Sequence, residues 1–108
     1  MNIDNGIKTE AREAIVKGFF ATLNQTLQST IESQSKVALN EKQKSVLEAT
    51  IKDIESIVSN RDKTEEKKRE EISQRIEQMK QGMNVQLSDN LRQWIYGGID
   101  AAAKLLRH

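Results

Sequence analysis

Residues 87–108 read L-S-D-N-L-R-Q-W-I-Y-G-G-I-D-A-A-A-K-L-L-R-H. Apolar and small side chains recur here at steps of one and three residues, which is the pattern of one face of an α-helix. Ser88 is a good N-cap, and Asp89 suits the positive end of the helix dipole. The pattern therefore predicts a helix over residues 88–106. Its apolar face consists of Leu91, Trp94, Ile95, Gly98, Ile99, Ala102, Leu105 and Leu106.

Two adjacent glycines, Gly97 and Gly98, lie inside this predicted helix. Each costs about 1 kcal/mol relative to alanine in a helix interior. Gly98 and Ala102 are four residues apart, and Gly97 and Ala101 repeat the spacing beside them. Small residues at this spacing let two helices approach closely, although glycine pairs also kink or break helices. We favour a close contact and keep a kink or break as the alternative.

The composition favours a single helical domain over residues 1–108. The chain contains no proline and only five glycines, so little interrupts long helices. No run of alternating β-branched residues predicts a strand. The chain has no cysteine for disulfides, and its first residues do not resemble a signal peptide, which together suggest a cytoplasmic protein. No apolar run is long enough to span a membrane.

Three further helices are expected from apolar periodicity, over residues 9–34, 41–59 and 63–81. Asn40 is the expected N-cap of the second helix, and Gly82 the expected C-cap of the third. The fold expected is all-α, with three or four antiparallel helices in a bundle or an elongated helical hairpin. Because so short a chain can bury only a thin core, we also expect self-association, most simply as a dimer.

The sequence allows two interpretations of the boundary between the second and third helices. Ser59 to Glu71 contains no apolar side chain. Asn60 favours a helix end in the left-handed conformation, and Asp62 followed by Glu65 resembles a capping box. We therefore predict a turn near Asn60, with one unbroken helix over residues 41–81 as the alternative.

Residues that could carry catalysis or hold a metal are scarce. The one histidine, His108, is the last residue, and cysteine is absent. The sequence lacks the paired Glu-x-x-His motifs of di-iron bundles and any glycine-rich phosphate loop. We therefore expect no metal, no cofactor, no small-molecule substrate and no enzymatic activity.

Two surface-binding hypotheses arise from the charge and aromatic patterns. Lys67, Lys68 and Arg69 form a short basic strip, but glutamates flank it on both sides, which argues against nucleic-acid binding. Phe19 and Phe20 lie among basic residues, as in helices that bind a membrane or lipid surface. A phenylalanine pair at helical spacing is more commonly part of a core.

The function expected is that of a small helical protein–protein interaction module, such as a scaffold, adaptor or regulator. The alternative is an amphipathic helical coat on a membrane or lipid-granule surface. Tryptophan is enriched at binding hot spots, but we favour Trp94 as the largest core residue. The candidate interaction or packing face consists of Trp94, Ile95, Gly98, Ile99, Ala102, Met79 and Met83.

Overall fold

A computed structural model describes the backbone of residues 2–107 and the side chains of residues 10–106. Within this range, helices account for all the regular secondary structure, which confirms the predicted all-α fold. The helices are α1 (Asn2–Ser35), α2 (Glu41–Ser59), α3 (Glu65–Met83) and α4 (Asp89–Arg107). Because α2 and α3 are separate, the alternative of one helix over residues 41–81 is wrong.

The helix starts follow the capping residues of the sequence. Asn40 and Gln43 form a capping box at α2: the Gln43 N–H donates to Asn40 Oδ1 at 2.8 Å, and the Asn40 N–H donates to Gln43 Oε1 at 3.0 Å. At α4 the Leu91 N–H donates to Ser88 Oγ at 3.1 Å. In contrast, α1 begins at Asn2 rather than at residue 9.

The caps of α3 differ from those predicted. Its N-cap is Thr64, whose hydroxyl accepts the Lys67 N–H at 3.2 Å, while the Asp62 N–H donates to Asn60 Oδ1 in the preceding turn. At its other end the helix continues through Gly82 and stops at Asn84, which is left-handed with φ 53°. Asparagine tolerates this conformation better than most residues. Asn60 ends α2 in an extended conformation, with φ −75° and ψ 116°.

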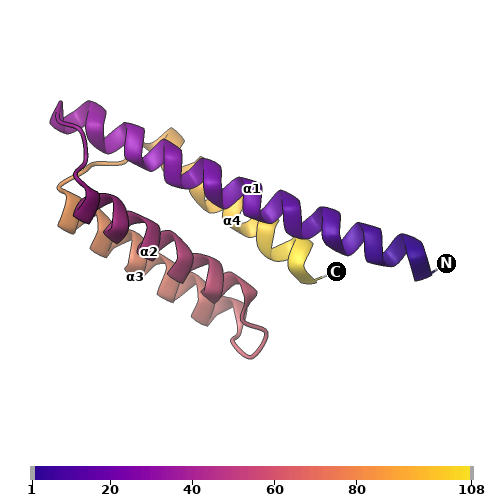
Figure 1. Ribbon diagram of the computed structural model, residues 1–108. Coiled ribbons are helices and arrows are strands. Elements are labelled where there is room, and N and C mark those ends of the chain that lie inside the picture. The colour runs from indigo at the N-terminus through magenta and orange to yellow at the C-terminus, as the bar shows by residue number, and fades with distance from the viewer. Residues whose placement is uncertain (1, 108) are drawn as a thin grey trace.

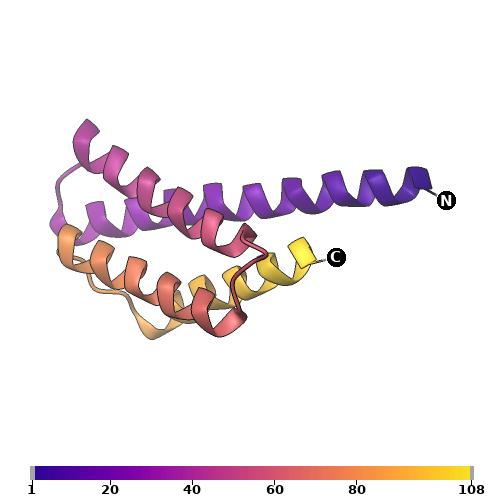
Figure 2. The same cartoon turned by 90° about the horizontal axis from the view of Figure 1, so that it is seen from below.

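The helices form two antiparallel pairs that pack together as a bundle, α1 with α4 and α2 with α3 (Figure 1). The first and last helices of the chain are therefore neighbours. α1 is the longest helix, and its N-terminal turns extend beyond the end of α4 (Figure 2). At the opposite end of α1, Gln34 binds the α3–α4 connection: its Nε2 donates to the Gln86 carbonyl at 2.6 Å, and its Oε1 accepts the Gln86 N–H at 3.0 Å.

All four helices contribute to one core of aliphatic side chains, a phenylalanine and a methionine. Leu23, Leu47, Ile54 and Ile95 lie at its centre and are at most 1% exposed. No polar or charged residue among those described is buried, so the core is held together by apolar burial. The core consists of Val16, Phe20, Leu23, Leu27, Ile31, Leu39, Leu47, Ile51, Ile54, Ile57, Val58, Ile72, Ile76, Met79, Val85, Leu87, Ile95, Ile99 and Ala102.

The glycine pair does not break α4, which is one continuous helix from Asp89 to Arg107. The predicted close contact is present at Gly98, where the Phe19 ring of α1 occupies the space that a Cβ atom would fill. The close partner is therefore an aromatic side chain rather than a second backbone. At Gly97 an added Cβ would meet no atom within 4 Å.

We expect Gly98→Ala to lower the free energy of unfolding by about 1 kcal/mol. Displacing the Phe19 ring should cost about 1–3 kcal/mol, as overpacking does, and the higher helix propensity of alanine offsets about 1 kcal/mol of this. The neighbouring Gly97→Ala is the matched control, and it should raise the same free energy by up to about 1 kcal/mol. Urea denaturation of dilute protein measures both. Equal stabilisation by the two substitutions would disprove the Phe19–Gly98 contact.

Candidate functional site

Most residues of the candidate interaction face lie inside the monomer. Ile95, Ile99 and Ala102 of α4 are at most 3% exposed, and Met79 of α3 is 5% exposed. Met83 is partly buried and packs against the same core. These residues hold the four helices together and do not present a surface to a partner.

Trp94 is the exception, and our assignment of it to the core is wrong. Its side chain is 39% exposed. Neighbouring residues of a helix point about 100° apart, so Trp94 and Ile95 cannot both point to the core centre. Ile95 takes that position, and the indole lies at the edge of α4 against Phe19, with ring centroids 5.5 Å apart.

The basic strip does not form one surface. Three consecutive residues point in three directions on a helix. Lys67 and Arg69 are exposed, whereas Lys68 is half-buried and its Nζ donates to the Val58 carbonyl at 3.1 Å. Lys68 thus satisfies a carbonyl at the C-terminal end of α2.

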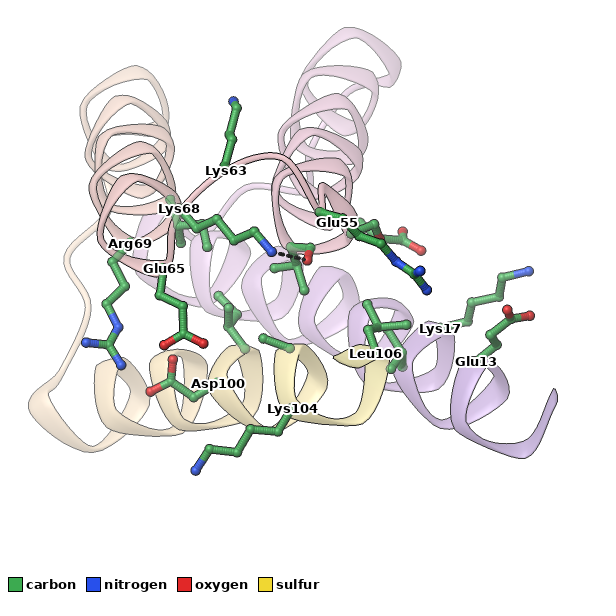
Figure 3. A pocket seen from close by; sticks show the side chains of 17 residues that line it. Glu13, Lys17, Glu55, Lys63, Glu65, Lys68, Arg69, Asp100, Lys104 and Leu106 are labelled. Atoms are coloured by element: carbon green, nitrogen blue, oxygen red, sulfur yellow. Dashed lines mark hydrogen bonds between the residues drawn. The ribbon is translucent and has the colours of Figure 1, made fainter. Parts of the chain in front are cut away.

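A cleft opens between the α1–α4 pair and the turn that joins α2 to α3 (Figure 3). Its volume is about 860 Å³. Buried aliphatic residues from each of the four helices form its floor, namely Val16, Val58, Ile72 and Ile99. Its rim carries charges of both signs, from Glu13, Lys17, Glu55, Arg61, Lys63, Glu65, Lys68, Arg69, Asp100 and Lys104.

The mixed rim gives the cleft no strong preference for a ligand of either charge. Six of these side chains are cationic and four are anionic. A surface for nucleic acid needs charges of one sign. Among the described residues, no group of three histidine, cysteine, aspartate or glutamate side chains is placed to hold a metal ion.

One ion pair orders the α2–α3 turn beside the cleft. Lys63 Nζ lies 2.7 Å from Glu71 Oε1. This hydrogen bond holds the pKa of the Glu71 carboxyl below its ordinary value; partial burial opposes the shift, and the charges of Lys63, Lys67 and Arg75 add to it. The pair ties the turn to the body of α3.

The outer side of the α1–α4 pair carries a second candidate site. Here the Phe19 ring, itself half-buried, lies between Gly98 and Trp94. Ile15, one turn before Phe19, is 59% exposed. We call this surface the α1–α4 face, and it consists of Ala11, Ile15, Gly18, Phe19 and Thr22 of α1 with Trp94, Gly97, Gly98, Ala101 and Leu105 of α4.

None of the residues of the α1–α4 face is charged, although charged residues make up 31% of the chain. Four charged side chains of the same helix turns line the cleft, namely Glu13 and Lys17 of α1 and Asp100 and Lys104 of α4, whereas Arg12 does not.

The sequence contained a signal for the exposed position of Ile15. The apolar residues of α1 between residues 14 and 23 cover too wide an arc of the helix to be buried by one packed face. Val16, Phe20 and Leu23 occupy the core, which leaves Ile15 outside. The periodicity could not show which residue of the wide arc would remain exposed.

The two phenylalanines do not form an exposed pair. Phe20 is 2% exposed, and Phe19 packs edge-on against it, with ring centroids 5.3 Å apart. In the folded monomer Phe20 is thus part of the core rather than of a lipid-facing surface. Over the described residues, no helix has the length and hydropathy needed to cross a membrane.

Comparisons with family models, with curated proteins and with solved structures gave no match for this chain. The assignment of a functional site therefore depends on the geometry and chemistry of the chain itself.

We expect Lys63→Met to raise the pKa of Glu71 toward its ordinary value, because the substitution removes the hydrogen bond and the charge together. Lys67→Met is the control, and it should raise this pKa less, since Lys67 acts through its charge alone. NMR titration of the Glu71 side chain measures both. A larger rise in Lys67→Met would contradict the pairing.

The same pair predicts the direction of a pH effect on stability. The folded pKa of Glu71 lies below the unfolded one, so the contribution of the pair is present above the unfolded pKa. It is lost as the pH falls through the folded pKa. The difference in unfolding free energy between the native chain and Lys63→Met should therefore shrink on acidification, as measured by urea denaturation at several pH values.

Proposed function

We propose that this chain is a helical protein–protein interaction module and that its α1–α4 face binds another protein chain. The observation that carries the proposal is the exposure of Ile15 and Trp94 beside Phe19. Aromatic residues at the centre of an uncharged patch are typical of binding hot spots. Among the residues whose side chains are described, the other two exposed large hydrophobic residues, Val37 and Val46, lie outside this face.

The charge of the α1–α4 face favours a protein partner over a lipid surface. Helices that bind anionic membranes present lysine and arginine beside their apolar residues. The ten residues that define the α1–α4 face include no lysine or arginine. An uncharged apolar face instead suits a partner surface that is itself apolar at its centre.

Photocrosslinking in cells tests the proposal directly. A photoreactive amino acid replaces Ile15 in one variant and Val46 in the matched control, since both side chains are large, apolar and exposed. We expect a discrete protein adduct from position 15 and none from position 46. The same adducts from both positions would show nonspecific contact, and no adduct from position 15 would overturn the proposal.

Trp94→Ala should separate binding from folding. Because Trp94 is 39% exposed, we expect its loss to lower the free energy of unfolding by less than the about 3–5 kcal/mol typical of a buried tryptophan. We expect affinity for the crosslinked partner to fall at least about 30-fold, which corresponds to about 2 kcal/mol of a hot-spot contact. Urea denaturation and isothermal titration measure the two effects. Full affinity in Trp94→Ala would exclude Trp94 from the binding site.

A further inference from the structure

We infer that Phe19 is a positioning residue for binding at the α1–α4 face: it holds the Trp94 indole in the orientation in which that face meets its partner. This inference rests on the proposed function, and it names the residue that prepares Trp94 for binding. A side chain that is already fixed before binding loses less conformational entropy when the complex forms. Three contacts of the Phe19 ring place it for this role.

Two of these contacts fix the Phe19 ring itself. One edge of the ring lies against Gly98 of α4 and fills the space of a Cβ atom there. The ring also meets Phe20 edge to face, with centroids 5.3 Å apart and an interplanar angle of 68°, which is a favoured arrangement of aromatic rings. Phe20 is 2% exposed and belongs to the core. The Phe19 ring is therefore anchored between the core and the backbone of α4.

The third contact passes this anchorage to Trp94. The Phe19 and Trp94 rings are 5.5 Å apart between centroids and tilted by 53°. The three aromatic residues thus form a continuous series from the centre of the molecule to its surface: Phe20 is buried, Phe19 is half-buried and Trp94 is exposed. An exposed side chain at the end of such a series has a neighbour that cannot move away from it.

On one side of the indole, α4 supplies no support of its own. Residues three and four positions apart are neighbours on a helix surface. Toward the N-terminus of α4 the neighbour of Trp94 is Leu91, which packs against the core. Toward the C-terminus its neighbours are Gly97 and Gly98, which have no side chain. The support on this side comes from Phe19, which belongs to a different helix.

Fluorescence of the folded chain tests the positioning role without a partner, because Trp94 is the only tryptophan. We expect Phe19→Leu to increase the fast-decaying fraction of the Trp94 anisotropy and to increase quenching by acrylamide, since the indole gains rotamers that the ring excludes. Circular dichroism checks that each variant is folded.

The matched control is Tyr96→Leu, which also removes a half-buried aromatic ring. Two residues along a helix point about 200° apart, and the Tyr96 hydroxyl donates to Ser73 Oγ of α3 at 3.4 Å. Tyr96→Leu should therefore leave the Trp94 anisotropy unchanged. An unchanged anisotropy in Phe19→Leu would overturn the inference, as would an equal change in Tyr96→Leu.

A double-mutant cycle tests whether Gly98 acts on Trp94 through Phe19. Gly98→Ala keeps all the aromatic rings but displaces that of Phe19, so it should increase the indole motion in the native chain. In the Phe19→Leu chain the same substitution should add little, because no ring remains to be displaced. Equal effects of Gly98→Ala in the two chains would contradict this route.

The binding role is measured with the partner that position 15 crosslinks. Isothermal titration should show an affinity about two- to tenfold lower in both Phe19→Leu and Gly98→Ala, which is the effect of freeing one side chain and is smaller than that of Trp94→Ala. Because Gly98→Ala removes no aromatic contact, its loss of affinity reports orientation. Tyr96→Leu, outside the α1–α4 face, should bind as the native chain does.

The outcomes separate this inference from the proposed function. If Trp94→Ala weakens binding while Phe19→Leu and Gly98→Ala bind normally, the inference fails and the proposed function stands. If position 15 yields no adduct, the proposed function fails, and the binding role of Phe19 fails with it. The anisotropy measurements decide in either case whether Phe19 orients Trp94.

Discussion

The contact between the Phe19 ring and Gly98 is the constraint on which the arrangement of the outer helices depends. It allows the first and last helices to lie close together, because any side chain at position 98 would push the ring away. The ring in turn supports Trp94 at the edge of α4. Gly98 thus allows the first and last helices to pack closely, and the same contact leaves Trp94 at the surface.

Charge is distributed unevenly around the α1–α4 pair. Glu13, Lys17, Asp100 and Lys104 line the cleft, while the ten residues that define the α1–α4 face are uncharged. The core itself contains no charged or polar residue among those described, so charge is not needed to hold the helices together. The distribution of charge therefore affects the surface rather than the stability of the core. It is one basis of the proposal that the α1–α4 face binds protein.

Local structure was largely predictable from local chemistry. Asn40 and Ser88 cap α2 and α4 because their short polar side chains reach backbone N–H groups two or three residues on. The predicted caps were wrong where two nearby residues could each cap the same helix end. Thr64 rather than Asp62 caps α3, and Asn84 rather than Gly82 ends it. Which of the two residues becomes the cap depends on where the next helix must lie, and local propensity carries no information about that position.

The sequence by itself determined an all-α chain of three or four helices, most of their approximate limits, and the absence of cysteine and of an internal histidine. It determined these because capping and periodicity act within a few residues. Only the tertiary structure decided which member of each ambiguous pair is buried: Ile95 rather than Trp94, and Val16 rather than Ile15. It also decided that Gly98 is crowded and Gly97 is open. These choices depend on the position of a second helix, and neighbouring residues on one helix differ only in the direction they face.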